Sequence, residues 1–285
     1  MKKFIVVIVL IVVIIGGKFY IDHQAKKEVD AAINEVSNRV NLTYKKVNRD
    51  LLGWNTHIKD ATLAPVGSKA KMQVEDVIVY NHNKPNENPV RLHIAFKGIR
   101  LGINADNFGD QAKRLNQLGY QQEIKGEMEL DYRYDREKKV FDLETFRMGA
   151  QEVGHLTAEL HLSNIDLNPN NFAFLLLTFP TILLNRAEIG YQDDSLMPRL
   201  QKAAADQEGK TVAELVDSIT KDLDEKIAKE DNKFSKDALK ALKKFVQHPE
   251  KITVTIAPKE PVAIGRFQRL DPIKLPEMLN MKIES

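Results

Sequence analysis

The chain has 285 residues, 29% of them charged, and a formal net charge of +2. Acidic and basic side chains are interleaved, which argues against nucleic-acid binding, because that function usually needs a concentrated basic face. The chain has no cysteine, so disulfide bonds and thiolate chemistry are excluded.

The first predicted element is a membrane anchor. Its core is an unbroken apolar run formed by Phe4, Ile5, Val6, Val7, Ile8, Val9, Leu10, Ile11, Val12, Val13, Ile14 and Ile15. Extended to Ile21 as a helix, it would rise about 27 Å, close to the roughly 30 Å hydrocarbon core of a bilayer. A cleaved secretory signal is the alternative, but residues 16–20 lack the small-x-small pattern of a cleavage site. We therefore expect an uncleaved signal-anchor, a transmembrane helix at residues 1–22.

Behind the anchor, residues 23–50 are predicted as a stalk helix and linker. Apolar residues from Val29 to Val40 recur at helical spacing on one narrow face. A β-rich domain is predicted to follow at residues 51–192, because the hydrophobic period changes to two.

Three strands are predicted early in this domain, at residues 54–63, 72–80 and 92–103, from alternating apolar and polar side chains. Gly98 interrupts the third of them and indicates a β-bulge. A short helix is predicted from Asp106 to Gly119, because glycine is common just after a helix C-terminus.

The clearest pattern in the chain predicts a β-meander. Apolar and polar residues alternate from Ile124 to Tyr134, then from Val140 to Met148 after a polar turn, and again from Leu156 to Leu162. This alternation is typical of antiparallel strands with one apolar face and one wet face. Such a sheet needs a cover over its apolar face.

Residues 168–185 are predicted to supply that cover. The apolar run from Phe172 to Leu184 is too short to cross a bilayer, and Pro180 interrupts it. We expect a buried helix or hairpin against the sheet, with a lipid-contacting element as the alternative. If the cover leaves an apolar groove, its lining residues are predicted to be Phe172, Phe174, Leu175, Leu176, Phe179 and Leu183.

Residues 193–250 are predicted as a charged helical segment with a solvated outer face. Thr211 and Glu214 have the spacing of a capping box and predict the start of one of its helices. Residues 251–285 are predicted to return to the sheet as a strand, a short helix and a final strand.

No catalytic motif is recognised. Residues 209–211 resemble the end of a phosphate-binding loop, but the upstream glycine is missing. His155 and His161 share a strand face, yet roughly 20 Å separates them, too far to ligate one metal ion. Asp193 and Asp194 are predicted to complement a helix N-terminus, with an acid or metal pair as the alternative. We therefore predict no catalytic residue, no cofactor and no metal site, and expect a non-enzymatic protein.

The first part of the chain resembles a known family. Gly-Lys-Phe-Tyr at residues 17–20, Ala-Ala-Ile-Asn at 31–34 and Asp-Leu-Leu-Gly-Trp at 50–54 resemble the opening of the bacterial YdgA-like envelope proteins. More loosely, amphipathic strands behind a single anchor are similar to AsmA-like proteins, which are implicated in envelope lipid homeostasis and transport. The resemblance implies an envelope protein and carries over no functional residue.

Together these patterns predict an α+β fold, in which an N-terminal transmembrane helix precedes a curved, mainly antiparallel β-sheet that helices cover on one face. The predicted function is a non-enzymatic module, anchored in the bacterial inner membrane and facing the periplasm, that binds a lipid or another amphiphile or assists its transport. The alternative is a scaffold that contacts envelope proteins through its charged helices. The expected partners are membrane lipids, a lipid ligand and other envelope proteins, without nucleic acid.

Overall fold

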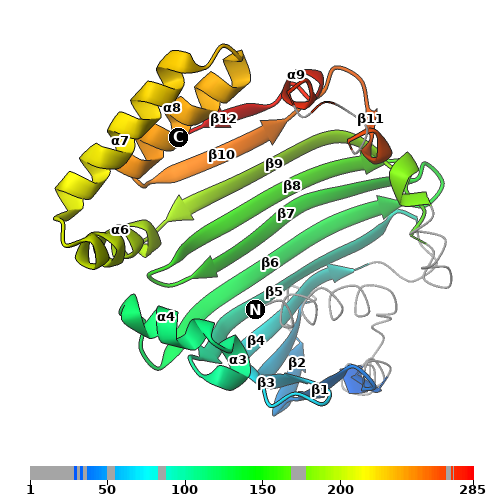
Figure 1. The fold of residues 1–285 in the computed structure, drawn as a ribbon. Helices are drawn as coiled ribbons and strands as arrows, with labels where there is room; N and C mark the ends of the chain where they lie inside the picture. Colours follow the sequence, from blue (N-terminus) through cyan, green and yellow to red (C-terminus); the bar gives the residue numbers. More distant parts are fainter. Residues whose placement is uncertain are drawn as a thin grey trace. The chain divides into compact units, whose positions relative to one another are not determined.

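The computed structural model describes residues 29–30, 33–34, 37–49, 55–82, 88–167, 178–267, 271 and 273–285. Figure 1 labels their helices and strands, and these residues belong to two compact units. Unit 1 comprises the chain through Glu137 together with Glu144–Ala150, and unit 2 comprises Lys138–Leu143 and Gln151–Ser285. The predicted domain boundaries stay predictions.

The elements of unit 1 are mainly strands. They are β1 (Val40–Thr43), β2 (Lys46–Arg49), β3 (Thr56–Pro65), β4 (Met72–His82), β5 (Val90–Gly102), α3 (Ala105–Phe108), α4 (Gln111–Gln117) and β6 (Glu123–Asp135). Strand β7 (Val140–Ala150) contributes residues to both units. Within unit 1 the strand order is β1-β3-β4-β5-β6, with β2 also on β3, and each of these pairs is antiparallel.

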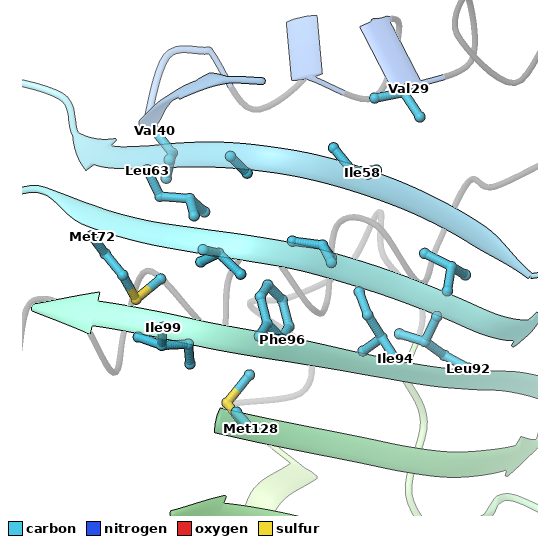
Figure 2. Close-up of a cluster of buried hydrophobic side chains, with 14 of the residues drawn as sticks. Val29, Val40, Ile58, Leu63, Met72, Leu92, Ile94, Phe96, Ile99 and Met128 are labelled. Carbon is cyan, nitrogen blue, oxygen red and sulfur yellow. The ribbon is translucent and has the colours of Figure 1, made fainter. Parts of the chain in front are cut away.

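Unit 1 buries the apolar side of its strands almost completely (Figure 2). Met72, Leu92 and Ile94 have 0% of their surface exposed and Phe96 has 1%. Val29, which precedes the strands in the chain, joins the same cluster. Each fully buried side chain of this size stabilises the fold by about 1.5–3 kcal/mol, so this cluster is the main source of stability in unit 1.

The predicted β-bulge at Gly98 is confirmed. The register between β5 and β6 shifts between Phe96 and Ile99, and Gly98 has a φ of 63°. A Cβ at this position would come within 2.5 Å of the Glu75 side chain. Glycine is therefore needed both for the positive φ and for the close approach.

Unit 2 combines strands with three longer helices. Its elements are β8 (Gly154–Ser163), η2 (Phe179–Thr181), β9 (Leu183–Asp193), α6 (Leu196–Glu208), α7 (Val212–Lys229), α8 (Lys233–Gln247), β10 (Lys251–Ile256), β11 (Val262–Ala263), η3 (Ile264–Arg266), α9 (Leu275–Met278) and β12 (Lys282–Glu284). The strand order is β8-β9-β10-β12, with β11 on β9, and the pairs are antiparallel.

The predicted helices after residue 195 are confirmed, as is the capping box of α7. The Thr211 hydroxyl accepts from the Glu214 backbone N–H, and the Glu214 carboxylate accepts from the Thr211 backbone N–H. Helix α8 packs against β10 and β12 (Figure 1), and its apolar side is buried at Ala241, Phe245 and Val246.

The predicted fold class, which began with an N-terminal transmembrane helix, needs correction. In the part of the chain that the structure describes, no helix combines the length and the apolar character needed to cross a membrane. The longest of these helices, α7, has 18 residues and carries acids and lysines along its length. The fold is therefore corrected to a mainly antiparallel β-sheet protein with twelve described strands and additional helices. The transmembrane helix and signal-anchor are not supported, and residues 4–15 themselves lie outside the described residues.

Two further predictions need correction. The stalk helix was expected to include Val40, but Val40 begins β1 and pairs with Pro65. The helix expected from Asp106 to Gly119 is divided into α3 and α4, because Gly109 has a φ of 58° and ends α3. In both cases one residue takes a backbone conformation that does not continue a helix.

Candidate functional site

The predicted apolar groove falls mainly outside the described residues. Four of its six residues belong to the segment 168–177, which the structure does not describe: Phe172, Phe174, Leu175 and Leu176. Phe179 lies in η2 with 48% of its surface exposed, and Leu183 is the half-buried first residue of β9. The groove inferred from the sequence therefore stays a prediction.

Another apolar surface lies on the strands of unit 2, which can be followed in Figure 1 as β8, β9, β10 and β12. The strand register places its side chains in three rows that run across the strands. The first row is Leu156, Tyr191 and Ile252, the middle row is Ala158, Ile189, Val254 and Ile283, and the third row is Leu160, Ala187 and Ile256. We call these ten residues the apolar face of unit 2.

This face follows from the alternation of the strands. Because successive side chains point to opposite sides of a sheet, the residues between the rows lie on the other side. Those residues are polar or small, for example Thr157, Glu159, Glu188 and Thr253. The sheet of unit 2 is therefore amphipathic, with one polar and one apolar side.

The apolar face of unit 2 is open at its centre. Ile189 has 49% of its surface exposed, although β8 and β10 flank it on both sides. Its register partners Ala158 and Val254 are half-buried. A single exposed isoleucine would be unremarkable in a protein surface, but the strand register surrounds Ile189 with other apolar side chains on both neighbouring strands.

The two outer rows are better covered than the middle row. In the first row, the ring of Tyr191 meets Phe245 of α8 edge-on, with 6.2 Å between the ring centroids. The Tyr191 hydroxyl lies 3.0 Å from the Val153 carbonyl and 2.8 Å from Asp193 Oδ1, which fixes the ring. In the third row, Ala187 has only 7% of its surface exposed. The opening is therefore centred on Ile189.

A second candidate is a cluster of acid–base pairs on the polar side of the strands of unit 1. Asp76 Oδ2 lies 2.8 Å from His57 Nδ1 and accepts from Lys59 Nζ at 2.6 Å, while Asp76 Oδ1 is buried without a hydrogen-bond partner. Carboxylates and cations already compensate one another here. The cluster is therefore explained as a part-buried carboxylate matched by a lysine and a histidine on the neighbouring strand β3.

The same paired arrangement continues onto β5 and β6. His93 Nε2 lies 2.8 Å from Glu129 Oε1. Lys97 donates to Glu127 at 2.7 Å, and this hydrogen bond raises the pKa of Lys97 above its ordinary value. Both pairs join neighbouring strands, so they support strand pairing.

The two histidines of β8 are each engaged by a different carboxylate. His155 Nε2 lies 3.2 Å from Asp194 Oδ2, and His161 contacts Asp142. Among the described residues, no group of three or more His, Asp or Glu side chains could hold a metal ion. Asp193 accepts from the Met197 backbone N–H at 2.9 Å, which confirms its predicted place at a helix N-terminus.

The fold and this surface define an antiparallel β-sheet protein whose second unit has a partly open apolar face. Comparison with protein families shows that the model of a family described as "Uncharacterized protein" matches residues 147–285. This range contains the whole apolar face of unit 2. No curated protein and no solved structure matches the chain. The YdgA-like resemblance rests on residues before the matched range and stays a prediction.

Proposed function

We propose that this protein is a non-enzymatic binding module, and that the apolar face of unit 2 holds the aliphatic chain of an amphiphile. The observation that carries the proposal is the 49% exposure of Ile189 within three rows of apolar side chains. Leaving an isoleucine half exposed forgoes about 1 kcal/mol of hydrophobic stabilisation. A ligand chain laid over the middle row would recover that free energy.

The size of the face favours a small ligand over a protein partner. Four strands spaced about 4.8 Å apart, with two steps of about 6.7 Å along each strand, give a patch on the order of 200 Å². A stable protein–protein interface buries about 800 Å² on each partner. A second copy of the chain would need a much larger surface, whereas one alkyl chain along the middle row matches the patch.

The scaffold alternative has weaker support from the helices. Lys243 of α8 donates to both carboxylate oxygens of Asp224 on α7 at 2.7 Å. Charges that pair with each other in this way are typical of a solvated helix surface, and they are not held available for a partner. The predicted periplasmic location is not required by the binding proposal and stays a prediction.

Calorimetric titration of the full-length protein with dodecyl maltoside, below its micelle concentration, tests the proposal. The uncharged headgroup isolates the contribution of the chain. We expect saturable binding with a negative heat-capacity change, the signature of apolar burial. Ile189→Glu should weaken binding by at least about tenfold, equivalent to about 1.4 kcal/mol.

Val66→Glu is the matched control. Val66 lies in unit 1 and has the same 49% exposure as Ile189, so the variant adds the same charge at an equally exposed apolar position. It should leave binding unchanged. If the wild-type chain shows no saturable binding, or if both variants lose it equally, the proposal is wrong.

A further inference from the structure

Tyr191 is the member of the apolar face that lies next to the opening on β9. Its nearest neighbours on the same side of this strand are Ile189 and Asp193, each two residues away. Two residues correspond to about 6.7 Å along a strand, a distance that an aromatic side chain leaning along its strand can span. The ring of Tyr191 could therefore lie toward Ile189 and cover it, or toward Asp193 and leave it open.

The structure places the ring on the Asp193 side. The Tyr191 hydroxyl lies 2.8 Å from Asp193 Oδ1 and 3.0 Å from the Val153 carbonyl oxygen. Gly154, the register partner of Asp193 on β8, leaves the space that the ring occupies. A Cβ at Gly154 would come within 2.7 Å of the Tyr191 hydroxyl oxygen and 2.9 Å of the ring atom Cε2. These contacts all lie on the side of Tyr191 that faces away from Ile189.

The hydroxyl contacts hold the ring against the hydrophobic effect. Ile189 is 49% exposed, so a ring turned over it would bury apolar surface, which is favourable. The edge-on contact with Phe245 does not involve the hydroxyl. Asp193 also accepts from the Met197 backbone N–H at 2.9 Å, so its carboxylate is fixed at the start of α6. Because a hydrogen bond to a carboxylate is stronger than one between neutral groups, this contact keeps the ring in place.

We infer that Tyr191 is a positioning residue that keeps the apolar face of unit 2 accessible, because Asp193 and Val153 hold its hydroxyl and the ring stays off Ile189. Without the hydroxyl, the ring turns over Ile189 and competes with the ligand for the same surface. The apparent affinity then falls in proportion to the fraction of molecules that are open. This consequence for binding rests on the proposed function, whereas the position of the ring can be tested without a ligand.

Maleimide labelling of full-length Ile189→Cys tests the position of the ring, because the chain has no other cysteine. Adding Tyr191→Phe should slow labelling at least about threefold, since phenylalanine keeps the ring and loses the hydroxyl contacts. Adding Tyr191→Ala should leave labelling as fast as in Ile189→Cys alone, or faster, since no ring remains to cover the thiol. A purely structural role for Tyr191 predicts that neither variant is slower, because lost contacts loosen the surroundings of the thiol.

Tyr44→Phe is the matched control. The Tyr44 hydroxyl, in unit 1, donates to Asp30 Oδ1 at 2.6 Å, so the variant removes the same type of hydrogen bond elsewhere. It should change neither the labelling of Ile189→Cys nor the affinity for dodecyl maltoside. Tyr191→Phe, with Ile189 retained, should weaken dodecyl maltoside binding by the same factor by which it slows labelling. Val66→Cys combined with Tyr191→Phe should be labelled at an unchanged rate, which shows that the effect is local.

Each outcome has a separate meaning. If Tyr191→Phe does not slow the labelling of Ile189→Cys, or if Tyr191→Ala or Tyr44→Phe slows it equally, the inference is wrong whatever the ligand result. If Tyr191→Phe alone slows labelling but the wild-type chain does not bind dodecyl maltoside, the position of the ring is confirmed and the proposed function is wrong. If Tyr191→Phe slows labelling and leaves the affinity for dodecyl maltoside unchanged, the role of Tyr191 in binding is wrong.

Discussion

Unit 1 and unit 2 both have an apolar sheet side made by alternating strands, but they bury it to different extents. In unit 1, Ile94 of β5 lies between Val79 and Leu130 and is 0% exposed. In unit 2, Ile189 of β9 lies between Ala158 and Val254 and is 49% exposed. Both isoleucines occupy interior strands, so the difference arises from what lies over the sheet.

The difference in burial between the two units has separate consequences for folding stability and for ligand binding. A covered apolar side contributes its transfer free energy to folding, whereas an open one leaves part of that free energy for a ligand. Substitutions in unit 1 should therefore cost folding free energy, and substitutions at Ile189 should cost affinity.

The largest effect is expected in the core of unit 1. Phe96→Ala should lower the free energy of unfolding by about 3–5 kcal/mol, because it removes a buried ring and leaves a cavity. Phe96 is 1% exposed. Urea denaturation of the full-length chain measures the change, with Ile189→Ala as the control, which should cost less than about 1 kcal/mol. If Phe96→Ala and Ile189→Ala lower the free energy of unfolding by the same amount, the contrast between the two units is wrong.

A smaller effect is expected at the bulge of β5. Gly98→Ala should cost about 2 kcal/mol, because alanine is strained at positive φ and its Cβ would displace Glu75 from its ion pair with Arg100. Gly67 has a φ of 73° with nothing within 4 Å of an added Cβ. Gly67→Ala should therefore cost only about 1 kcal/mol. If Gly98→Ala and Gly67→Ala have the same unfolding midpoint, the close approach of Glu75 to Gly98 adds nothing to the cost of the substitution.

A third prediction concerns the start of α7 in unit 2. Thr211→Ala should destabilise the helix by about 1 kcal/mol through loss of its N-cap. The hydrogen bonds from the Thr211 backbone and hydroxyl lower the pKa of Glu214, so NMR titration of the variant should show that pKa moving up toward its ordinary value.

The contribution of Glu214 to folding stability should depend on pH in a defined direction. A carboxylate whose pKa is lowered by folding contributes stability above its unfolded pKa, and this contribution disappears as the pH falls through the folded-state pKa. The difference in stability between wild type and Thr211→Ala should therefore narrow in acid. An unchanged Glu214 pKa in the variant would show that the hydroxyl has no part in the shift.

Local patterns in the sequence predicted the elements that are determined by residues close together in the chain. The strands β6, β7 and β8 were predictable from strict alternation, the bulge from Gly98, and the N-terminus of α7 from the spacing of Thr211 and Glu214. Strand β9 begins at Leu183, inside the segment 168–185 that was predicted to cover the sheet. Its first residues belong to the apolar run after Phe172, in which periodicity cannot distinguish a buried strand from a helix.

The candidate site could be predicted only in part. Alternation in β8 gave an apolar side with Leu156, Ala158 and Leu160, but the exposure of Ile189 could not be read from its own strand. That exposure depends on where α8 lies, and α8 is held by contacts such as Phe245 with Tyr191, which join residues far apart in the sequence. The transmembrane helix was predicted from an apolar run, residues 4–15, that lies outside the described residues, and among the described helices none is long and apolar enough to cross a membrane.

The most direct test uses the absence of cysteine from the chain, because a single introduced thiol can then be labelled without background. Maleimide labelling of the full-length variants Ile189→Cys, Val66→Cys and Ile94→Cys compares the open face, an equally exposed control and the closed core. We expect Ile189→Cys to react about as fast as Val66→Cys and far faster than Ile94→Cys, and dodecyl maltoside to slow only Ile189→Cys. If Ile189→Cys is as unreactive as Ile94→Cys, the apolar face of unit 2 is closed in solution and the account of its binding is contradicted.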